Sequence, residues 1–170
     1  MSVRTLRLRQ AVDWRAAIWA GLIGGAAFLA AIIVLPWLAL GDRWLGMRIM
    51  ASVVLGPSAV PPPDAFRIEV GLAALGVCLV LSVVFACVVA FVVHRGGMAA
   101  GFVGGALIGL ALYAINFYTL SYFAPWLFPL RSWMLLVAHA IYGALVGLTY
   151  ELLEVERFVP TEDSPAEAAP

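Results

Sequence analysis

Long stretches without a charged residue dominate the chain, and four of them stand out: 16–40, 70–93, 96–130 and 132–150. An α-helix needs about 20 residues to cross the hydrocarbon core of a bilayer. The third stretch is too long for one helix, and the two prolines of YFAPWLFPL (residues 122–130) should end its helix near Phe123. The pattern predicts four transmembrane helices, at about 16–40, 68–94, 97–123 and 132–153.

A different pattern fills the predicted outer loop at 41–67, which contains RIMASVVLGPSAVPPPDAF (residues 48–66). Its apolar part, residues 49–56, rises only about 12 Å as a helix and cannot cross the bilayer. The prolines that follow favour an extended return, and Asp64 is a candidate N-cap for the next helix. We therefore expect a short interfacial or re-entrant helix at about 44–56, folded over the outer mouth of the bundle.

Composition supports a membrane protein, because 64% of the residues are hydrophobic and 12% are charged, whereas about a quarter are charged in soluble domains. We predict an all-α four-helix membrane bundle at 16–153, between a basic N-terminal segment at 1–15 and an acidic, disordered tail at 154–170. The first apolar run exceeds the roughly 7–15 residues of a signal peptide. The net charge is zero and the sequence has no basic stripe, so we expect no binding of nucleic acid. The expected partner is the lipid bilayer.

The placement of arginines sets the expected orientation, because cytoplasmic loops carry an excess of basic residues. With the N-terminus inside, the inner side holds Arg4, Arg7, Arg9, Arg15, Arg95 and Arg157. The outer side then holds Arg43, Arg48, Arg67 and Arg131. We expect a multi-pass protein of the bacterial inner (plasma) membrane with both termini in the cytoplasm.

Small residues recur at four-residue spacing in every predicted helix. Between helices in lipid, close backbone contact supplies the attraction. The predicted packing glycines are Gly21, Gly25, Gly97, Gly101, Gly105, Gly109, Gly143 and Gly147. They indicate tight helix packing, within the chain, with other membrane subunits or in a homo-oligomer. The likeness of GLIGGA (21–26) to GFVGGA (101–106) also suggests a duplicated hairpin, although richness in Gly and Ala alone produces such matches.

Asn116 and His139 are predicted to lie at similar depth on facing helices, each about seven residues from the outer end of its helix, with Tyr113 nearby. A contact between them would either tie two helices together or form a ligand or proton site. We favour the tie, because no Asp, Glu, Lys or Arg lies inside any span to continue a proton or ion path. His94 and Glu151 form a second candidate pair, at the inner ends.

Other candidate chemistry is sparse. Cys78 and Cys87 lie nine residues apart on one predicted helix, about 13 Å, too far for a disulfide. No Cys-x-x-Cys or phosphate-binding loop occurs, so we predict no catalytic residue, no metal and no cofactor. An outer polar patch, which either anchors the helix ends or binds lipid head groups or a partner, consists of Arg43, Arg48, Asp64 and Arg131. We favour anchoring.

Four phrases carry a resemblance to a known family: ASVVLGPSAVPPPDAF, LSVVFACVVAFVVHR, LYAINFY and FPLRSWMLLVAHAIYGALVG. Together they resemble short bacterial four-helix integral membrane proteins, some of which are labelled sodium:proline symporter, over residues 16–150. The resemblance implies a four-helix fold and brings no catalytic residues. Symporters have discontinuous helices around ion sites at the midplane, and no predicted span of this chain is broken.

These observations favour a non-catalytic polytopic inner-membrane protein that serves as a small accessory or structural subunit of a membrane complex. The alternative is a small oligomeric transporter or channel with a polar site at Asn116, Tyr113 and His139. A membrane enzyme is less favoured, because no acid, base and nucleophile converge in the sequence.

Overall fold

Four long helices form the body of the protein in the computed structural model, which describes residues 8–62, 67–155 and 157–160. Each is long and apolar enough to cross a membrane. They are α1 (Trp14–Leu40), α3 (Ile68–Val93), the span Gly97–Tyr122 and α5 (Trp133–Leu153). The prediction of an all-α four-helix membrane bundle is confirmed, with helix ends within two residues of those expected.

The third span changes its helical form along its length. α4 (Gly97–Ala114) continues into a π-helical turn, η2 (Ile115–Thr119), and then a 3-10 turn, η3 (Leu120–Tyr122). In η2 the Leu120 N–H donates to the Ile115 carbonyl, five residues earlier. This corrects the expectation of an unbroken regular helix. Single π turns are frequent at functional sites, because they change the direction in which nearby side chains point.

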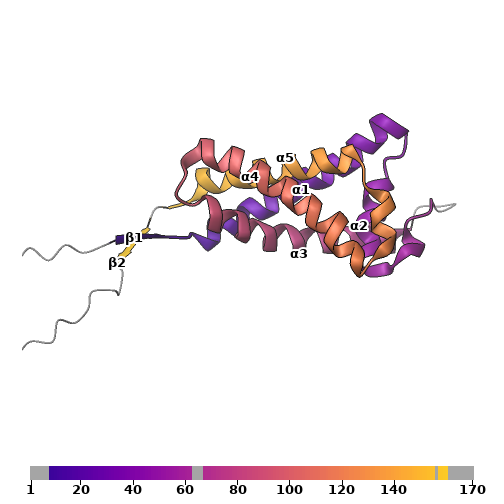
Figure 1. Cartoon of the computed structure of the whole chain (residues 1–170), viewed down its shortest axis with the longest axis horizontal. Helices are drawn as coiled ribbons and strands as arrows, with labels where there is room; N and C mark the ends of the chain where they lie inside the picture. The colour runs from indigo at the N-terminus through magenta and orange to yellow at the C-terminus, as the bar shows by residue number, and fades with distance from the viewer. Residues whose placement is uncertain (1–7, 63–66, 156, 161–170) are drawn as a thin grey trace, which may run out of the picture.

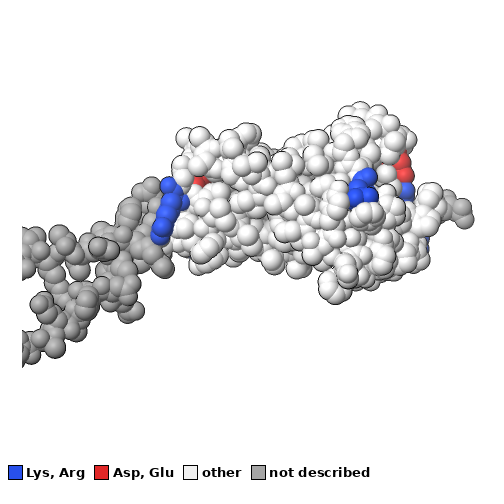
Figure 2. Space-filling model, viewed as in Figure 1, with Lys and Arg blue, Asp and Glu red and all other residues white. Residues whose placement is uncertain are grey.

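The two ends of the bundle carry different structures (Figure 1). α2 (Leu45–Leu55) lies at one end, followed by the turn η1 (Pro57–Ala59), and it confirms the short helix expected at 44–56. The turn η4 (Pro125–Leu130) leads into α5 at this end, whereas β1 (Leu8–Ala11) and β2 (Arg157–Pro160) lie at the other. Charged side chains gather at the two ends and leave the middle of the visible face uncharged (Figure 2), as expected in a bilayer.

The two strands were not among the predicted elements. β1 and β2 pair antiparallel, with Leu8 opposite Pro160 and Ala11 opposite Arg157. The pairing corrects the expectation of a disordered tail for residues 157–160, while 161–170 lie outside the described residues. Its physical reason is that the helices bring two segments side by side, whose backbone N–H and C=O groups can then satisfy each other.

Asp13 connects these two segments. Its Oδ1 accepts from the backbone N–H groups of Arg15 and Ala16, at 3.0 and 3.2 Å, which makes it the N-cap of α1. Its own N–H donates to the Tyr150 hydroxyl at 3.2 Å, and its Oδ2 accepts from the Val155 N–H at 3.3 Å. One side chain therefore starts α1 and binds the end of α5, so α1 begins two residues earlier than expected.

α4 and α5 approach each other closely along small residues. A Cβ on Gly105 would collide with the Gly143 carbonyl, and a Cβ on Gly143 would collide with the Gly105 carbonyl. Gly101 and Gly147 repeat this reciprocal contact one turn further along, and Gly109 lies against the backbone of α5. The predicted packing role of these five glycines is confirmed, and their partner lies in the same chain.

α1 lies between α3 and α5. Gly21 and Gly25 face α3, as packing glycines, while Gly24 faces Val146 of α5. Gly97 corrects the prediction, because a Cβ there would meet nothing within 4 Å. Its φ of 72° belongs to the left-handed region, which glycine adopts without strain, so it serves the turn that starts α4.

Both hairpins pack through glycines of their first helix against small residues or backbone of their second helix, α1 on α3 and α4 on α5. This likeness agrees with a duplicated hairpin. It also follows from the general use of small residues between membrane helices. The duplication therefore stays a prediction.

We expect Gly143→Ala to destabilise the bundle by about 1–3 kcal/mol, because the added methyl group meets a backbone carbonyl that moves only if α4 and α5 separate. Gly76→Ala in α3 is the matched control: a Cβ there meets nothing within 4 Å, so stability should stay equal or rise slightly. Unfolding in detergent micelles, followed by circular dichroism, measures both variants. Equal stability of the two would contradict the close α4–α5 contact.

Candidate functional site: two cavities beneath α2

Two adjoining cavities lie beneath α2, among α1, α3, the third span and α5. They offer about 30 and 50 Å³ to the centres of water molecules. Both are lined by Phe28, Met50, Leu81, Asn116 and His139. The predicted polar pair therefore lies where the two cavities meet.

Each cavity also has walls of its own. The larger, called here the α2 cavity, is lined in addition by apolar residues that include Ile49 and Val53 of α2. The smaller, called here the α3 cavity, is lined in addition by Cys78, Ser82 and Phe85 of α3 and by Tyr142 of α5. The α2 cavity is thus nearly apolar, whereas the α3 cavity has several polar groups.

The predicted contact between Asn116 and His139 is confirmed, because Asn116 Nδ2 lies 3.1 Å from His139 Nε2. Helix direction explains how they meet. Each Cα–Cβ bond tilts toward the N-terminus of its own helix, and these two helices run in opposite directions. Asn116 therefore tilts toward the middle of the bundle and His139 toward the α2 end.

Hydrogen bonds determine which nitrogen of the His139 ring carries the proton. Its Nδ1 lies 2.7 Å from the Leu135 carbonyl oxygen, one turn earlier on α5. Because a carbonyl oxygen only accepts, Nδ1 carries the proton, and Nε2 of the neutral ring accepts from Asn116 Nδ2. Both ring nitrogens are therefore used within the protein.

The Asn116 amide, in contrast, is only partly used. Its Oδ1 is buried and has no hydrogen-bond partner among the described residues. Leaving a buried acceptor unsatisfied costs roughly 1–3 kcal/mol, and native structures seldom do so. Asn116 lines both cavities, so a molecule inside them is the candidate donor to this oxygen.

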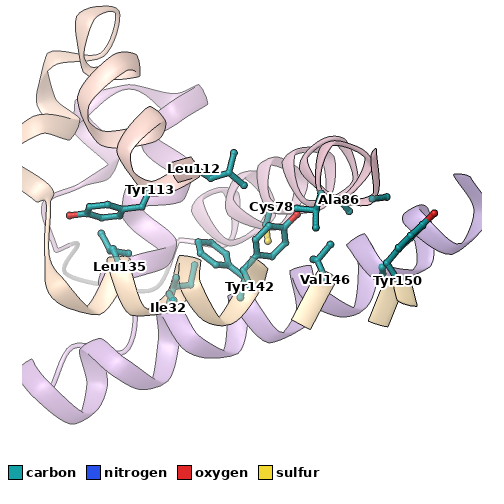
Figure 3. Close-up of a cluster of buried hydrophobic side chains, with 14 of the residues drawn as sticks. Ile32, Cys78, Ala86, Leu112, Tyr113, Leu135, Tyr142, Val146 and Tyr150 are labelled. Atoms are coloured by element: carbon teal, nitrogen blue, oxygen red, sulfur yellow. The ribbon is translucent and has the colours of Figure 1, made fainter. Parts of the chain in front are cut away.

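Aromatic rings fix the orientation of His139. The ring centroids of Phe28, Tyr113 and Phe117 lie 4.9, 5.6 and 6.1 Å from that of His139, all in edge-to-face geometry. Such pairs contribute about 0.5–1.5 kcal/mol each beyond the area they bury. Tyr113, a predicted member of the site, thus contributes its ring, and its hydroxyl points away from Tyr142 (Figure 3).

A second polar cluster, which was not predicted, lies in the α3 cavity. The Tyr142 hydroxyl donates to the Ser82 carbonyl at 2.7 Å, and Cys78 Sγ lies 3.7 Å from Ser82 Oγ. Figure 3 shows Tyr142 beside Cys78 within the buried apolar cluster. A sequence signal existed, because Tyr142 follows His139 by three residues and so shares its helix face. Cys78 and Cys87 are free thiols, as expected.

An ion pair holds α2 in place. Arg48 Nη2 lies 2.6 Å from Asp42 Oδ2, Nη1 lies 3.3 Å from Oδ1, and Nε donates to the Val60 carbonyl at 2.9 Å. The Arg48 residue is 5% exposed. The prediction of an interfacial Arg48 is therefore wrong, because its guanidinium joins the two ends of the α2 segment and is satisfied there.

Two further contacts dock α2 on the bundle. Pro36 of α1 has no N–H to donate to the Ile32 carbonyl, four residues earlier. Gly46 of α2 lies so close to this carbonyl that a Cβ has no room. On the other side, the Trp126 Nε1–H donates to Ser52 Oγ at 3.3 Å, which joins α2 to η4. α2 is thus a cap fixed on three sides.

The pairing of His94 with Glu151 at the inner ends stays a prediction. His94 Nδ1 lies 2.8 Å from the Phe91 carbonyl of its own helix. Glu151 lies with its Cγ against Gly101 of α4.

The rest of the predicted outer patch separates into individual residues. Arg43 lies over the Trp44 ring at 5.4 Å, and Arg131 lies over the Phe128 ring at 3.5 Å. These pairs fit the anchoring of helix ends. Asp64 lies outside the described residues.

Comparison of the chain with protein-family models, curated proteins and solved structures finds no match to any of them. Within the described ranges, no group of three or more His, Cys, Asp or Glu residues is placed to hold a metal ion. The fold and the cavities define a multi-pass membrane protein with a capped internal site. The chemistry of this site is therefore inferred from Asn116, His139 and the residues that line the cavities around them.

We expect Asp42→Asn to loosen α2, because it removes the charged partner of a buried guanidinium. The hydrogen bonds and charge of Arg48 hold the pKa of Asp42 below its ordinary value. A carboxyl group whose pKa is lower in the folded than in the unfolded protein stabilises the folded state at pH values above its unfolded-state pKa. This stabilisation is lost as the pH falls through its folded-state pKa. The protection of the α2 amides against hydrogen exchange should therefore decrease below about pH 4 in the wild type. In Asp42→Asn this pH dependence should be absent.

Hydrogen exchange of the α2 amides, corrected for intrinsic exchange rates, measures this effect. Glu69→Gln is the matched control, because Glu69 and its partner Arg67 are both about half exposed and an exposed pair contributes little. Equal α2 protection in wild type, Asp42→Asn and Glu69→Gln at neutral pH would contradict the role given to Arg48.

Nitrogen-15 NMR of the His139 ring in bilayers at neutral pH should show a protonated Nδ1 and an unprotonated Nε2. Asn116→Leu, which removes the donor to Nε2, should shift the Nε2 resonance and leave Nδ1 protonated. A ring protonated on Nε2 alone would overturn the assigned hydrogen-bond network.

Proposed function

We propose that the protein is a non-catalytic, multi-pass protein of the bacterial inner membrane that binds a small molecule in the two cavities beneath α2. The observation that carries this proposal is the buried Oδ1 of Asn116, which has no partner among the described residues and belongs to a residue that lines both cavities. In a membrane-embedded site, a polar group of this kind usually marks a functional position. A bound molecule with a donor group would satisfy it.

The orientation is part of the same proposal. β1 and β2 lie at the same end of the bundle (Figure 1), which supports the expectation that both termini are on one side of the membrane. The sequence predicts six arginines on that side and four on the other, which favours the cytoplasm for it. With this orientation, the cavities and α2 lie in the outer half of the membrane. We also propose that the chain belongs to the family of short bacterial four-helix membrane proteins that it resembles.

The structure alters the support for an accessory-subunit role. That role was motivated by glycine stripes, whose partner the sequence left open between this chain and another, together with short loops and missing catalytic chemistry. Gly101, Gly105, Gly143 and Gly147 instead contact one another within the chain, so they no longer favour an external partner. The accessory role stays a prediction, and the second candidate function is a small transporter, which the π turn at Asn116 favours because ligand sites in transporters occur where helices are interrupted.

Native mass spectrometry of the protein purified from its own membranes tests the binding role. We expect a small adduct on the wild type that is lost in Asn116→Leu, since leucine keeps the volume and removes the acceptor. Ile115→Ala is the matched control, because the neighbouring Ile115 is 46% exposed, on the outside of the bundle. A wild type that carries no adduct under any mild extraction would contradict the proposal.

A further inference from the structure

We infer that the cavities take a neutral hydroxyl compound, an alcohol or phenol with a compact apolar body, which enters from the lipid between α3 and the third span. This inference rests on the proposed binding function and adds the ligand class and the route. It depends on the charge of the walls, the number of polar partners and the position of the rim.

The walls favour a neutral ligand. No Asp, Glu, Lys or Arg is found among the described residues that line the two cavities. His139 is held as a neutral ring, since Nδ1 donates to Leu135 and Nε2 accepts from Asn116. An ion in this position would be buried without a counter-charge, at a cost of many kcal/mol. Sodium ions and charged amino acids are therefore poor occupants.

The polar groups favour one hydroxyl on an apolar body. In the α2 cavity the only polar side chains among the described lining residues are Asn116 and His139, and both ring nitrogens of His139 are already bonded. A water molecule there would have Asn116 as its single side-chain partner, whereas buried waters have 2–4 partners. A hydroxyl that donates to Asn116 Oδ1, with its apolar part against Ile49 and Val53, satisfies the site better.

The rim favours entry from the lipid. Leu81, Phe85 and Asn116 line the α3 cavity and are each half-buried, so we place the opening of the cavity beside them. Leu81 lies thirteen residues from the start of α3 at Ile68, about 20 Å along the helix. In a hydrocarbon core about 30 Å thick, this opening faces acyl chains. The water side is covered by α2, which Arg48 fixes.

The space limits the size of the ligand. The cavities offer about 30 and 50 Å³ to the centres of water molecules, so the apolar body is compact. Met50 lines both cavities, and its flexible side chain can move to admit a six-membered ring. We therefore choose para-fluorophenol as the probe and para-fluorotoluene as its matched partner without a hydroxyl.

The full chain is reconstituted in nanodiscs, and saturable binding of each probe is followed by fluorine NMR against empty nanodiscs. We expect the phenol to bind the wild type about tenfold more tightly than the toluene, the effect of one hydrogen bond. Asn116→Leu should lose this preference and bind both probes alike. Met50→Trp, which leaves the polar pair intact and fills both cavities, should bind neither, and it keeps the test valid if Asn116→Leu does not fold.

The route has its own measurement. Phe85→Trp narrows the opening between α3 and the third span, so exchange of the bound phenol should slow several-fold while the amount bound at saturation is kept. Leu107→Trp is the matched control, because Leu107 is 62% exposed on the outer surface of α4 and lines neither cavity. Equal exchange rates in the two variants would overturn entry from the lipid.

Each outcome of the binding test separates the two proposals. Equal binding of the phenol and the toluene by the wild type would overturn the inferred recognition of the hydroxyl, but it would still support the proposed binding function. A native adduct without phenol binding, or a charged adduct, overturns the ligand class alone. Absence of both the adduct and probe binding overturns the proposed function together with this inference, and water is then the occupant that satisfies Asn116.

Discussion

The close contact between the backbones of α4 and α5 is the constraint on which the rest of the structure depends. In lipid there is little hydrophobic force to hold two apolar helices together, so attraction has to come from short-range packing. Gly105 and Gly143 supply it by leaving no room for side chains. The contact continues to Gly109, which lies against the carbonyl of His139. The register that places His139 within reach of Asn116 is therefore set by glycines.

The same solvent requires each buried polar group to find a partner inside the protein. His139 finds two, and the Tyr142 hydroxyl finds the carbonyl of Ser82. Asn116 satisfies this rule only in part, since its Nδ2 is hydrogen-bonded to His139, whereas its Oδ1 has no hydrogen-bond partner among the described residues. A structural tie and a ligand site, which were treated as alternatives, are thus compatible: one half of the amide joins the helices and the other half faces the cavities.

The sequence predicted what depends on length and spacing. Helix ends, α2, the glycine contacts and the meeting of Asn116 with His139 follow from counting residues along helices of known rise. The sequence could not predict contacts that form only when segments far apart in the chain are brought together by the fold. Arg48 is buried because Asp42 and Val60 converge on it, and the buried Tyr142 hydroxyl is satisfied because α3 offers a carbonyl there. Likewise, β2 forms because the helices bring it beside β1, next to the contacts that Asp13 makes with Tyr150 and Val155.

The position of α2 decides how the site communicates with its surroundings. A gate toward water would need a segment with few fixed contacts, but α2 has an ion pair between the buried Arg48 and Asp42, backbone contact at Gly46 and a hydrogen bond at Ser52. Opening it would expose all three at once. The rim beside Leu81 and Phe85 needs only side-chain movement, because these residues are already half-buried. For the proposed ligand, the less costly route therefore leads sideways into the bilayer, while α2 would keep water away from Asn116.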